Sequence, residues 1–137
     1  PLAQQDTWGL LVRDDHPLAK KASLTAEDVA SCPLLLPLRE NIRAEILHWL
    51  GREEKELRIP LFYTLLSNAA LMVAEGLGCA FCIDGALAIR SDPRLRFLPL
   101  KPRRMTHSVL VWKKNNLFSP ATSLFIQEIN LLRAQME

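Results

Sequence analysis

Two of the three cysteines are three positions apart, a spacing used by metal-binding and redox motifs. Cys79 and Cys82 lie in the stretch CAFCI, which is apolar throughout and follows a glycine turn. In a strand, residues three apart point to opposite faces of the sheet. We therefore interpret both cysteines as small buried side chains and predict no metal site here.

Other residue types that could support catalysis do not form a recognisable motif. His16, His48 and His107 are far apart in sequence and have no ligand spacing. The sequence does not exclude a catalytic site of Ser, His and Asp, but it contains no G-x-S-x-G motif that would indicate one. We predict that the chain is not an enzyme, has no catalytic residues and needs no cofactor.

The stretch LMVAEGLGCAF, residues 71–81, raises the question of a phosphate-binding turn. A phosphate cradle has its glycine loop between a strand and a following helix, so that amides at the helix N-terminus face the anion. Here the order is reversed, because Gly76 and Gly78 follow a helix and precede a strand. The negative end of the helix dipole disfavours phosphate. We predict a hinge, with Gly76 as a left-handed helix terminus.

Composition indicates an ordinary folded domain or two small lobes. The 137 residues are 49% hydrophobic and 23% charged, with a formal net charge of +2. So small a charge argues against a nucleic-acid-binding surface within these residues. The short basic cluster Lys101, Arg103 and Arg104 is either solvated or in contact with an anion. No apolar run is long enough to cross a bilayer, and no secretory signal is visible. The cysteine count suits a reducing compartment. We therefore expect a cytoplasmic location.

Strand and helix patterns alternate along the chain and predict an α/β fold. Strands are expected over 7–13, 33–37, 57–63, 79–83, 95–100 and 106–113. Helices are expected from Thr25, from Asn41 to Gly51, from Thr64 or Ser67 to Glu75, over 85–89, and from Ser119. Asp28 completes a capping box with Thr25 in the first of these helices. The last helix has Phe125, Ile129, Leu132 and Met136 on one face. The alternation implies a mainly parallel sheet covered on both faces. Ligands bind such sheets beyond the carboxyl ends of strands, which selects residues 38–41 and 63–67.

Two stretches carry a family resemblance: WGLLVRDDHPLAKKASLTAEDVASCPLLLP, residues 8–37, and NAALMVAEGLGCAF, residues 68–81. The first contains a DHPLA element, a Thr-x-Glu-Asp helix start and a short PLLL strand; the second ends in VAEGLG at the matching distance. In this order and spacing, the chain resembles the effector-binding domain of LysR-type transcriptional regulators. The resemblance covers essentially the whole chain.

The resemblance implies a periplasmic-binding-protein-like domain that holds a small-molecule effector between two lobes. Residues 1–32 would be part of lobe I, residues 33–102 a complete lobe II, and residues 103–137 the return to lobe I with the C-terminal helix. The hinge would lie near 32–34 and 100–103. Relatives of this kind form homo-oligomers and bind DNA through an N-terminal helix-turn-helix, which is not among these residues.

The resemblance also assigns effector contacts to particular positions. Arg13 matches a strand position that relatives often turn toward the effector, where a guanidinium would suit an anion. Its alternative role is a solvated charge at a strand end. Leu38, Arg39, Glu40 and Asn41 match the loop that opens the first helix of lobe II.

A second group of expected contacts follows the next strands. Phe62, Tyr63 and Thr64 match the cleft end of a strand, where Phe62 could instead pack in the core. Asp84 departs from the family pattern, since relatives usually continue with Leu-Pro after the stretch that matches GLGCAF. Its carboxylate could repel an acidic effector or accept a hydrogen bond from a hydroxyl or amine. A solute-binding protein of a transport system would share the two-lobed architecture and is the alternative function.

Overall fold

The computed structural model describes residues 5–87, 92–115 and 117–136. These residues fall into two compact units. One unit is Asp6–Met105, and the other includes Gln5 and the described residues from Thr106 onward. The expected boundary between residues 32 and 33 does not coincide with a boundary of these units, because β1 and α1 belong to the same unit as the segment that follows them.

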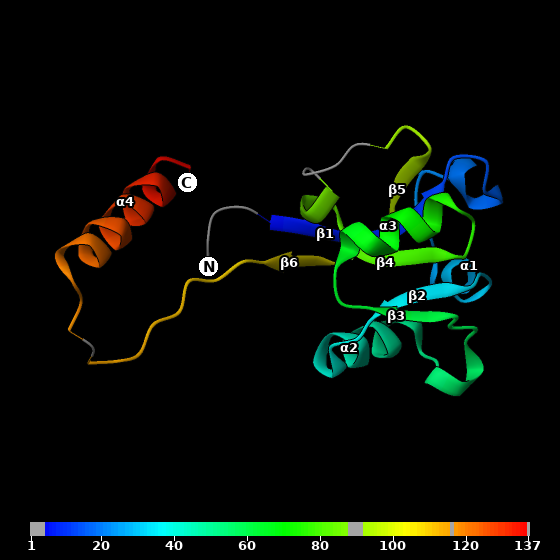
Figure 1. Ribbon diagram of the computed structural model, residues 1–137, viewed down its shortest axis with the longest axis horizontal. Helices are drawn as coiled ribbons and strands as arrows, with labels where there is room; N and C mark the ends of the chain where they lie inside the picture. Colours follow the sequence, from blue (N-terminus) through cyan, green and yellow to red (C-terminus); the bar gives the residue numbers. More distant parts are fainter. Residues whose placement is uncertain (1–4, 88–91, 116, 137) are drawn as a thin grey trace. The chain divides into compact units, whose positions relative to one another are not determined.

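The unit Asp6–Met105 contains five strands of the sheet with helices between them (Figure 1). In chain order its elements are β1 (Gln5–Arg13), the 3-10 turn η1 (Pro17–Lys20), α1 (Ala26–Ala30), β2 (Leu34–Pro37), α2 (Glu40–Leu50), η2 (Glu54–Glu56), β3 (Leu61–Tyr63), α3 (Leu66–Ala74), β4 (Cys79–Ile83), η3 (Asp84–Leu87) and β5 (Leu95–Pro99).

The strands are arranged in the order β3-β2-β4-β1-β5, and their directions are mixed. β2 runs parallel to both β3 and β4, whereas β1 runs antiparallel to both β4 and β5. The α/β class is confirmed, but the expectation of a mainly parallel sheet holds only for β2, β3 and β4. Helix-containing crossovers join those three strands in sequence, whereas β1 is joined to neither neighbour in that way.

Both faces of the sheet are buried, as the sequence predicts. Leu34 and Leu36 of β2 pack into a core with residues of α1 and α2, while Leu35 packs on the opposite face with residues of α3. The same alternation sends Cys79 to the first core and Cys82 to the second. The interpretation of the CxxC spacing as two buried strand residues on opposite faces is therefore confirmed.

Several predicted helix ends are confirmed by their backbone geometry. The Asp28 amide donates to Thr25 Oγ1 at 3.2 Å, and the Thr25 amide donates to Asp28 Oδ2 at 3.0 Å, which completes the capping box. Gly51 ends α2 with φ of 63°, and Gly76 follows α3 with φ of 83°. Both values lie in the left-handed region that glycine adopts readily.

Three predicted elements differ from the structure. The strand expected over 57–63 is confined to Leu61–Tyr63, because Pro60 has no N–H for a ladder bond. Helix α3 begins at Leu66, with Leu65 as an N-cap that makes no side-chain hydrogen bond, so neither hydroxyl residue caps it. The helix expected over 85–89 is the 3-10 turn η3 at Asp84–Leu87, and residues 88 and 89 lie outside the described part.

The second unit contains α4 (Pro120–Met136), and β6 (Met105–His107) pairs with β1 outside the main strand order. Of the expected strand 106–113, only residues 106 and 107 belong to a strand, and Val109, Val111 and Trp112 are exposed. Ser119 caps α4 by accepting a hydrogen bond from the Thr122 amide at 3.2 Å.

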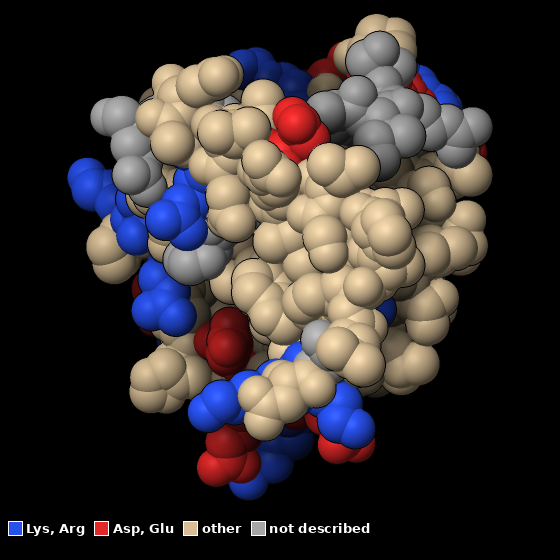
Figure 2. Space-filling model, turned by 90° about the vertical axis from the view of Figure 1, so that its left-hand side faces the viewer, with Lys and Arg blue, Asp and Glu red and all other residues tan. Residues whose placement is uncertain are grey.

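The predicted apolar face of α4 is largely exposed within the described residues. Phe125 and Leu132 are each 57% exposed, Ile129 is half-buried, and the side chain of Met136 lies outside the described part. Figure 2 shows one face of the molecule, which is mainly uncharged, with Lys and Arg toward the margins. In the described segments, no helix combines the length and hydrophobicity that a membrane span requires.

Candidate functional site

The parallel strands β2, β3 and β4 end at one edge of the sheet, and a pocket lies there. Its volume is about 250 Å³. The antiparallel strand β1 begins at the same edge, because its residue Trp8 is paired with Ile83 at the end of β4. We call this site the strand-end pocket, and its lining residues are Trp8, Pro37, Arg39, Ile42, Tyr63, Thr64, Leu66, Cys82, Ile83 and Ala86.

The loop after β2 is held in place by hydrogen bonds to the backbone of Leu38. The Leu38 amide donates to the Tyr63 carbonyl at 2.8 Å, and Arg43 Nη1 donates to the Leu38 carbonyl at 2.8 Å. Leu38, Arg39, Glu40 and Asn41 are all exposed, as expected of a loop that opens a helix. Of these four predicted residues, only Arg39 lines the strand-end pocket.

At the end of β3, two predicted residues line the pocket and one packs elsewhere. The Tyr63 hydroxyl donates to the Phe81 carbonyl at 2.5 Å, and burial raises the pKa of Tyr63, so the ring stays neutral. Thr64 is exposed at the pocket, and its hydroxyl has no hydrogen-bond partner among the described residues. Phe62 packs against the core beneath α2, which agrees with the alternative that it is a core residue. The Arg43 guanidinium lies 5.0 Å from its ring centroid.

Asp84 has a structural role beside the strand-end pocket. Its Oδ1 accepts hydrogen bonds from the amides of Thr7 at 2.8 Å and Gly85 at 2.9 Å, which ties η3 to the beginning of β1. Ile83 and Ala86 on either side of this turn line the pocket, whereas Asp84 does not. The carboxylate expected to face the effector is therefore already engaged with backbone donors.

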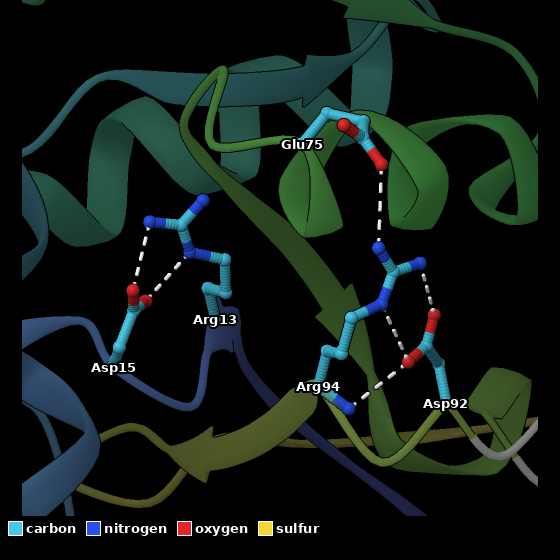
Figure 3. A network of polar contacts seen from close by, with 5 residues as sticks. All are labelled: Arg13, Asp15, Glu75, Asp92 and Arg94. Carbon is cyan, nitrogen blue, oxygen red and sulfur yellow. Dashed lines mark hydrogen bonds and ion pairs between the residues drawn. The ribbon is translucent and has the colours of Figure 1, made fainter.

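Arg13 lies at the opposite edge of the sheet from the strand-end pocket. It ends β1, and the register Leu11 to Ala80 places the end of β1 beside the beginning of β4. Arg13 Nε and Nη2 donate to the two carboxylate oxygens of Asp15 at 2.6 and 2.8 Å (Figure 3). This hydrogen-bonded pair raises the pKa of Arg13 and lowers the pKa of Asp15.

The structure therefore does not bring Arg13 together with the expected residues at this pocket, and its role as an effector contact stays a prediction. The antiparallel pairing of β1 with β4 and β5 places its last residue at the far edge. A separate ion-pair group lies at that edge, where Arg94 contacts Glu75 at 3.3 Å and Asp92 at 2.9 Å (Figure 3).

Sequence reasoning missed the apolar part of the pocket. Trp8, Ile42 and Leu66 line it without any motif of their own, and only the strand directions and helix starts reveal them. Cys82 also lines it, but burial raises the pKa of this thiol to about 12, so it is protonated at neutral pH. The pocket thus offers an apolar surface, one guanidinium and one unpaired hydroxyl. These are features of a site that binds a small molecule.

A mixed sheet with helices on both faces and a pocket where three parallel strands end defines an α/β domain of the ligand-binding type. Comparison with known families leads further. A family model described as the LysR substrate binding domain matches residues 1–132. The chain belongs to this family.

Solved structures of other proteins share the fold. HinK, a LysR family transcriptional regulator from Pseudomonas aeruginosa, is 18% identical, with a TM-score of 0.73 over 99% of this chain and 47% of that one. The regulatory domain of CcmR from Synechocystis PCC6803, in complex with 2-PG, is 14% identical, with a TM-score of 0.75 over 97% and 65% of the two chains. The effector-binding domain of QuiR, in complex with shikimate, is 15% identical, with a TM-score of 0.75 over 98% and 64%.

The chain spans about half to two thirds of the length of these structures, with coverages from 47% to 65%. A search of curated protein sequences gave no match.

Proposed function

We propose that the chain is the small-molecule effector-sensing domain of a LysR-type transcriptional regulator. The observation that carries this proposal is the strand-end pocket, which opens at the ends of three parallel strands in a fold of this family. Two relatives with this fold are complexes with 2-PG and with shikimate, which supports a small organic ligand. The family match gives no support to a transport solute-binding protein, and the pocket chemistry favours binding over catalysis.

The lining of the strand-end pocket supports an effector with an anionic group and an apolar part. Arg39 offers a forked set of donors that suits a carboxylate or phosphate. Trp8, Ile42 and Leu66 offer apolar surface for the rest of the molecule. Because the Asp84 carboxylate is engaged with backbone amides outside the pocket, its charge is less of an obstacle to an acidic effector than the sequence suggested.

The unit Asp6–Met105 would be lobe II, and the described residues from Thr106 onward would belong to lobe I. It differs from the boundaries near residues 33 and 102 that the resemblance implies, and those boundaries stay a prediction. The exposed apolar side chains of α4 suit a helix that packs against further parts of lobe I. An effector that binds the closed arrangement of the two lobes more tightly than the open one would shift the equilibrium between them toward the closed form. The size of this shift is set by the difference between the two affinities.

DNA binding in this proposal belongs to a helix-turn-helix outside these residues. A formal net charge of +2 gives these residues little electrostatic attraction for a phosphate backbone. The exposed apolar side chains of α3 suit contact with a second copy of the chain, in agreement with the proposed homo-oligomer. The regulator would act in the cytoplasm, where its DNA is.

Isothermal titration of the full-length protein with a library of small organic acids, phosphates and neutral metabolites tests the proposal. We expect at least one compound to bind and to change the occupancy or contacts of the protein on its DNA. The same compound should raise the melting temperature of the chain described here, since ligand at a hundred times Kd contributes about 2.7 kcal/mol. The proposal fails if no compound binds while DNA occupancy stays constant throughout the library.

A further inference from the structure

A second hollow lies in the unit Asp6–Met105, beside the beginning of β1 and the end of β5. Its volume is about 530 Å³, and it shares no lining residue with the strand-end pocket. This volume falls within the range of small-molecule sites. We call it the basic hollow, and its walls include Thr7, Ser23, Phe97, Leu100, Lys101 and Arg103.

Two cations in the basic hollow have no acidic partner within the described residues. Lys101 and Arg103 are exposed, and neither is within ion-pair distance of a carboxylate in the part of the chain that the structure describes. Arg103 Nη2 donates to Thr7 Oγ1 at 3.1 Å, which orients the guanidinium while leaving its other N–H groups available. The Lys101 amide donates to the Leu24 carbonyl at 2.7 Å, so the backbone that carries the ammonium is fixed.

The acidic residues near the basic hollow offset these charges only in part. Asp84 lines it, but its Oδ1 already accepts two backbone amide hydrogen bonds. Asp6 lies next to Gly85, is only 8% exposed and does not line the hollow. Two unpaired cations facing one engaged carboxylate leave a site that favours an anion.

One wall of the basic hollow is apolar. Phe97 and Pro99 are half-buried, and Leu100 is 3% exposed. An inorganic anion would gain nothing from this wall, whereas a hydrocarbon group would gain from leaving water there. The ligand that fits both the charge and the wall is an organic carboxylate with a short hydrocarbon body.

We propose that the basic hollow is a second ligand site, specific for small organic carboxylates and separate from the strand-end pocket. Arg103 and Lys101 bind the carboxylate, Ser23 offers a hydroxyl, and Phe97 contacts the hydrocarbon. Thr7 and Arg103 lie close to the two points, at Asp6 and Met105, where the chain enters and leaves this unit. A bound carboxylate would therefore join both crossing segments.

Amide chemical-shift titration of the whole 137-residue chain tests this proposal, with hexanoate, inorganic phosphate and hexylammonium as ligands. We expect saturable shifts at Thr7 and Lys101 with hexanoate, weaker binding of phosphate, and no binding of hexylammonium at this site. Lys101→Gln should weaken hexanoate binding about tenfold, and adding Arg103→Gln should weaken it further. Lys101 is exposed, so its substitution does not threaten folding.

Matched variants separate a built site from general electrostatics. Arg104→Gln removes the same charge from a neighbouring residue that does not line the basic hollow, and it should leave the Kd within about twofold. Ser23→Phe keeps every charge but fills the hollow, and it should abolish binding. An equal loss in Arg104→Gln, or persistent binding in Ser23→Phe, would overturn the proposal.

The ligand comparison and the strand-end pocket supply the remaining outcomes. Phosphate binding as tightly as hexanoate would overturn the assignment to organic carboxylates, and absence of saturable hexanoate binding would overturn the site itself. Arg39→Gln should leave hexanoate binding at the basic hollow unchanged. If instead Arg39→Gln abolishes all hexanoate binding while Lys101→Gln does not, the second site is refuted and the proposed effector pocket is supported.

Discussion

The hydroxyl of Tyr63 on β3 donates a hydrogen bond to the carbonyl of Phe81 on β4, although β2 lies between these two strands. The parallel register pairs Leu35 with Ala80, and the Cys79 amide donates to the Pro33 carbonyl at 2.9 Å. Continuing this ladder would require the nitrogen of Pro37 to donate to Phe81, but proline has no N–H. The tyrosine hydroxyl supplies the donor that the strand lacks at the wall of the strand-end pocket.

Tyr63→Phe should therefore destabilise the chain by about 1–3 kcal/mol, because it leaves a buried carbonyl without this donor. Urea unfolding followed by tryptophan fluorescence measures the change. Thr64→Val is the matched control: it removes the adjacent hydroxyl, which is exposed and has no partner in the described residues. Similar losses of unfolding free energy in the two variants would show that the hydrogen bond from Tyr63 to Phe81 does not stabilise the fold.

Tyr63 should also resist ionisation in the folded chain. It is the single tyrosine in the sequence, so absorbance of tyrosinate reports on it alone. Burial raises its pKa above the ordinary value of about 10. The folded state keeps the proton while the unfolded state loses it, so this contribution to stability is complete below pH of about 10 and declines as pH rises toward the folded pKa. A titration near pH 10 in the native chain would contradict this.

The elements that sequence reasoning predicted well are those with local causes. The continuous apolar run Leu34, Leu35 and Leu36 is visible in the sequence, and the two faces of β2 are buried as that pattern requires. The capping box at Thr25 and the left-handed Gly76 likewise depend on residues within one helix end. Strand pairing is different, because it depends on residues distant in sequence.

The direction of β1 accounts for most of what the sequence did not reveal about the site. Its antiparallel pairing moves Arg13 away from the strand-end pocket and brings Trp8 into it. No local pattern distinguishes a parallel from an antiparallel strand when both faces are buried. The role of Asp84 was hidden for the same reason, because its hydrogen-bond donor at Thr7 is 77 positions away.

Arg39→Gln should weaken binding of an anionic effector by about tenfold to a hundredfold, since it removes a charge-assisted pair of hydrogen bonds at the strand-end pocket. Isothermal titration with the effector found in the library measures this. Arg13→Gln removes the same charge at the opposite edge of the sheet and should leave the Kd unchanged. A larger effect of Arg13→Gln than of Arg39→Gln would mean that the effector binds elsewhere.

Gly9→Ala should destabilise the chain by about 2–3 kcal/mol, because the space for a side chain is occupied. An added Cβ at Gly9 would overlap the backbone carbonyl oxygen of Leu98 and the ring of Phe97 on β5. Relief would require separating β1 from β5. Gly51→Ala serves as comparison: its φ of 63° disfavours alanine, but nothing lies within 4 Å, so a loss of about 1 kcal/mol is expected. Equal losses of stability for Gly9→Ala and Gly51→Ala, measured by thermal unfolding, would show that β1 and β5 leave room for a side chain at Gly9.

Leu71→Lys should reduce self-association of the chain if α3 contacts a second copy. Leu71, Met72 and Leu77 are 48%, 37% and 46% exposed, and they line a groove of about 570 Å³. A charge placed there would have to lose its hydration in any apolar interface, which is costly without a partner. Sedimentation velocity over a range of concentrations measures the effect. Leu38→Lys is the control, since Leu38 is 53% exposed but lies outside this groove. A chain that stays monomeric at every concentration, or equal dissociation in both variants, would exclude α3 as the contact surface.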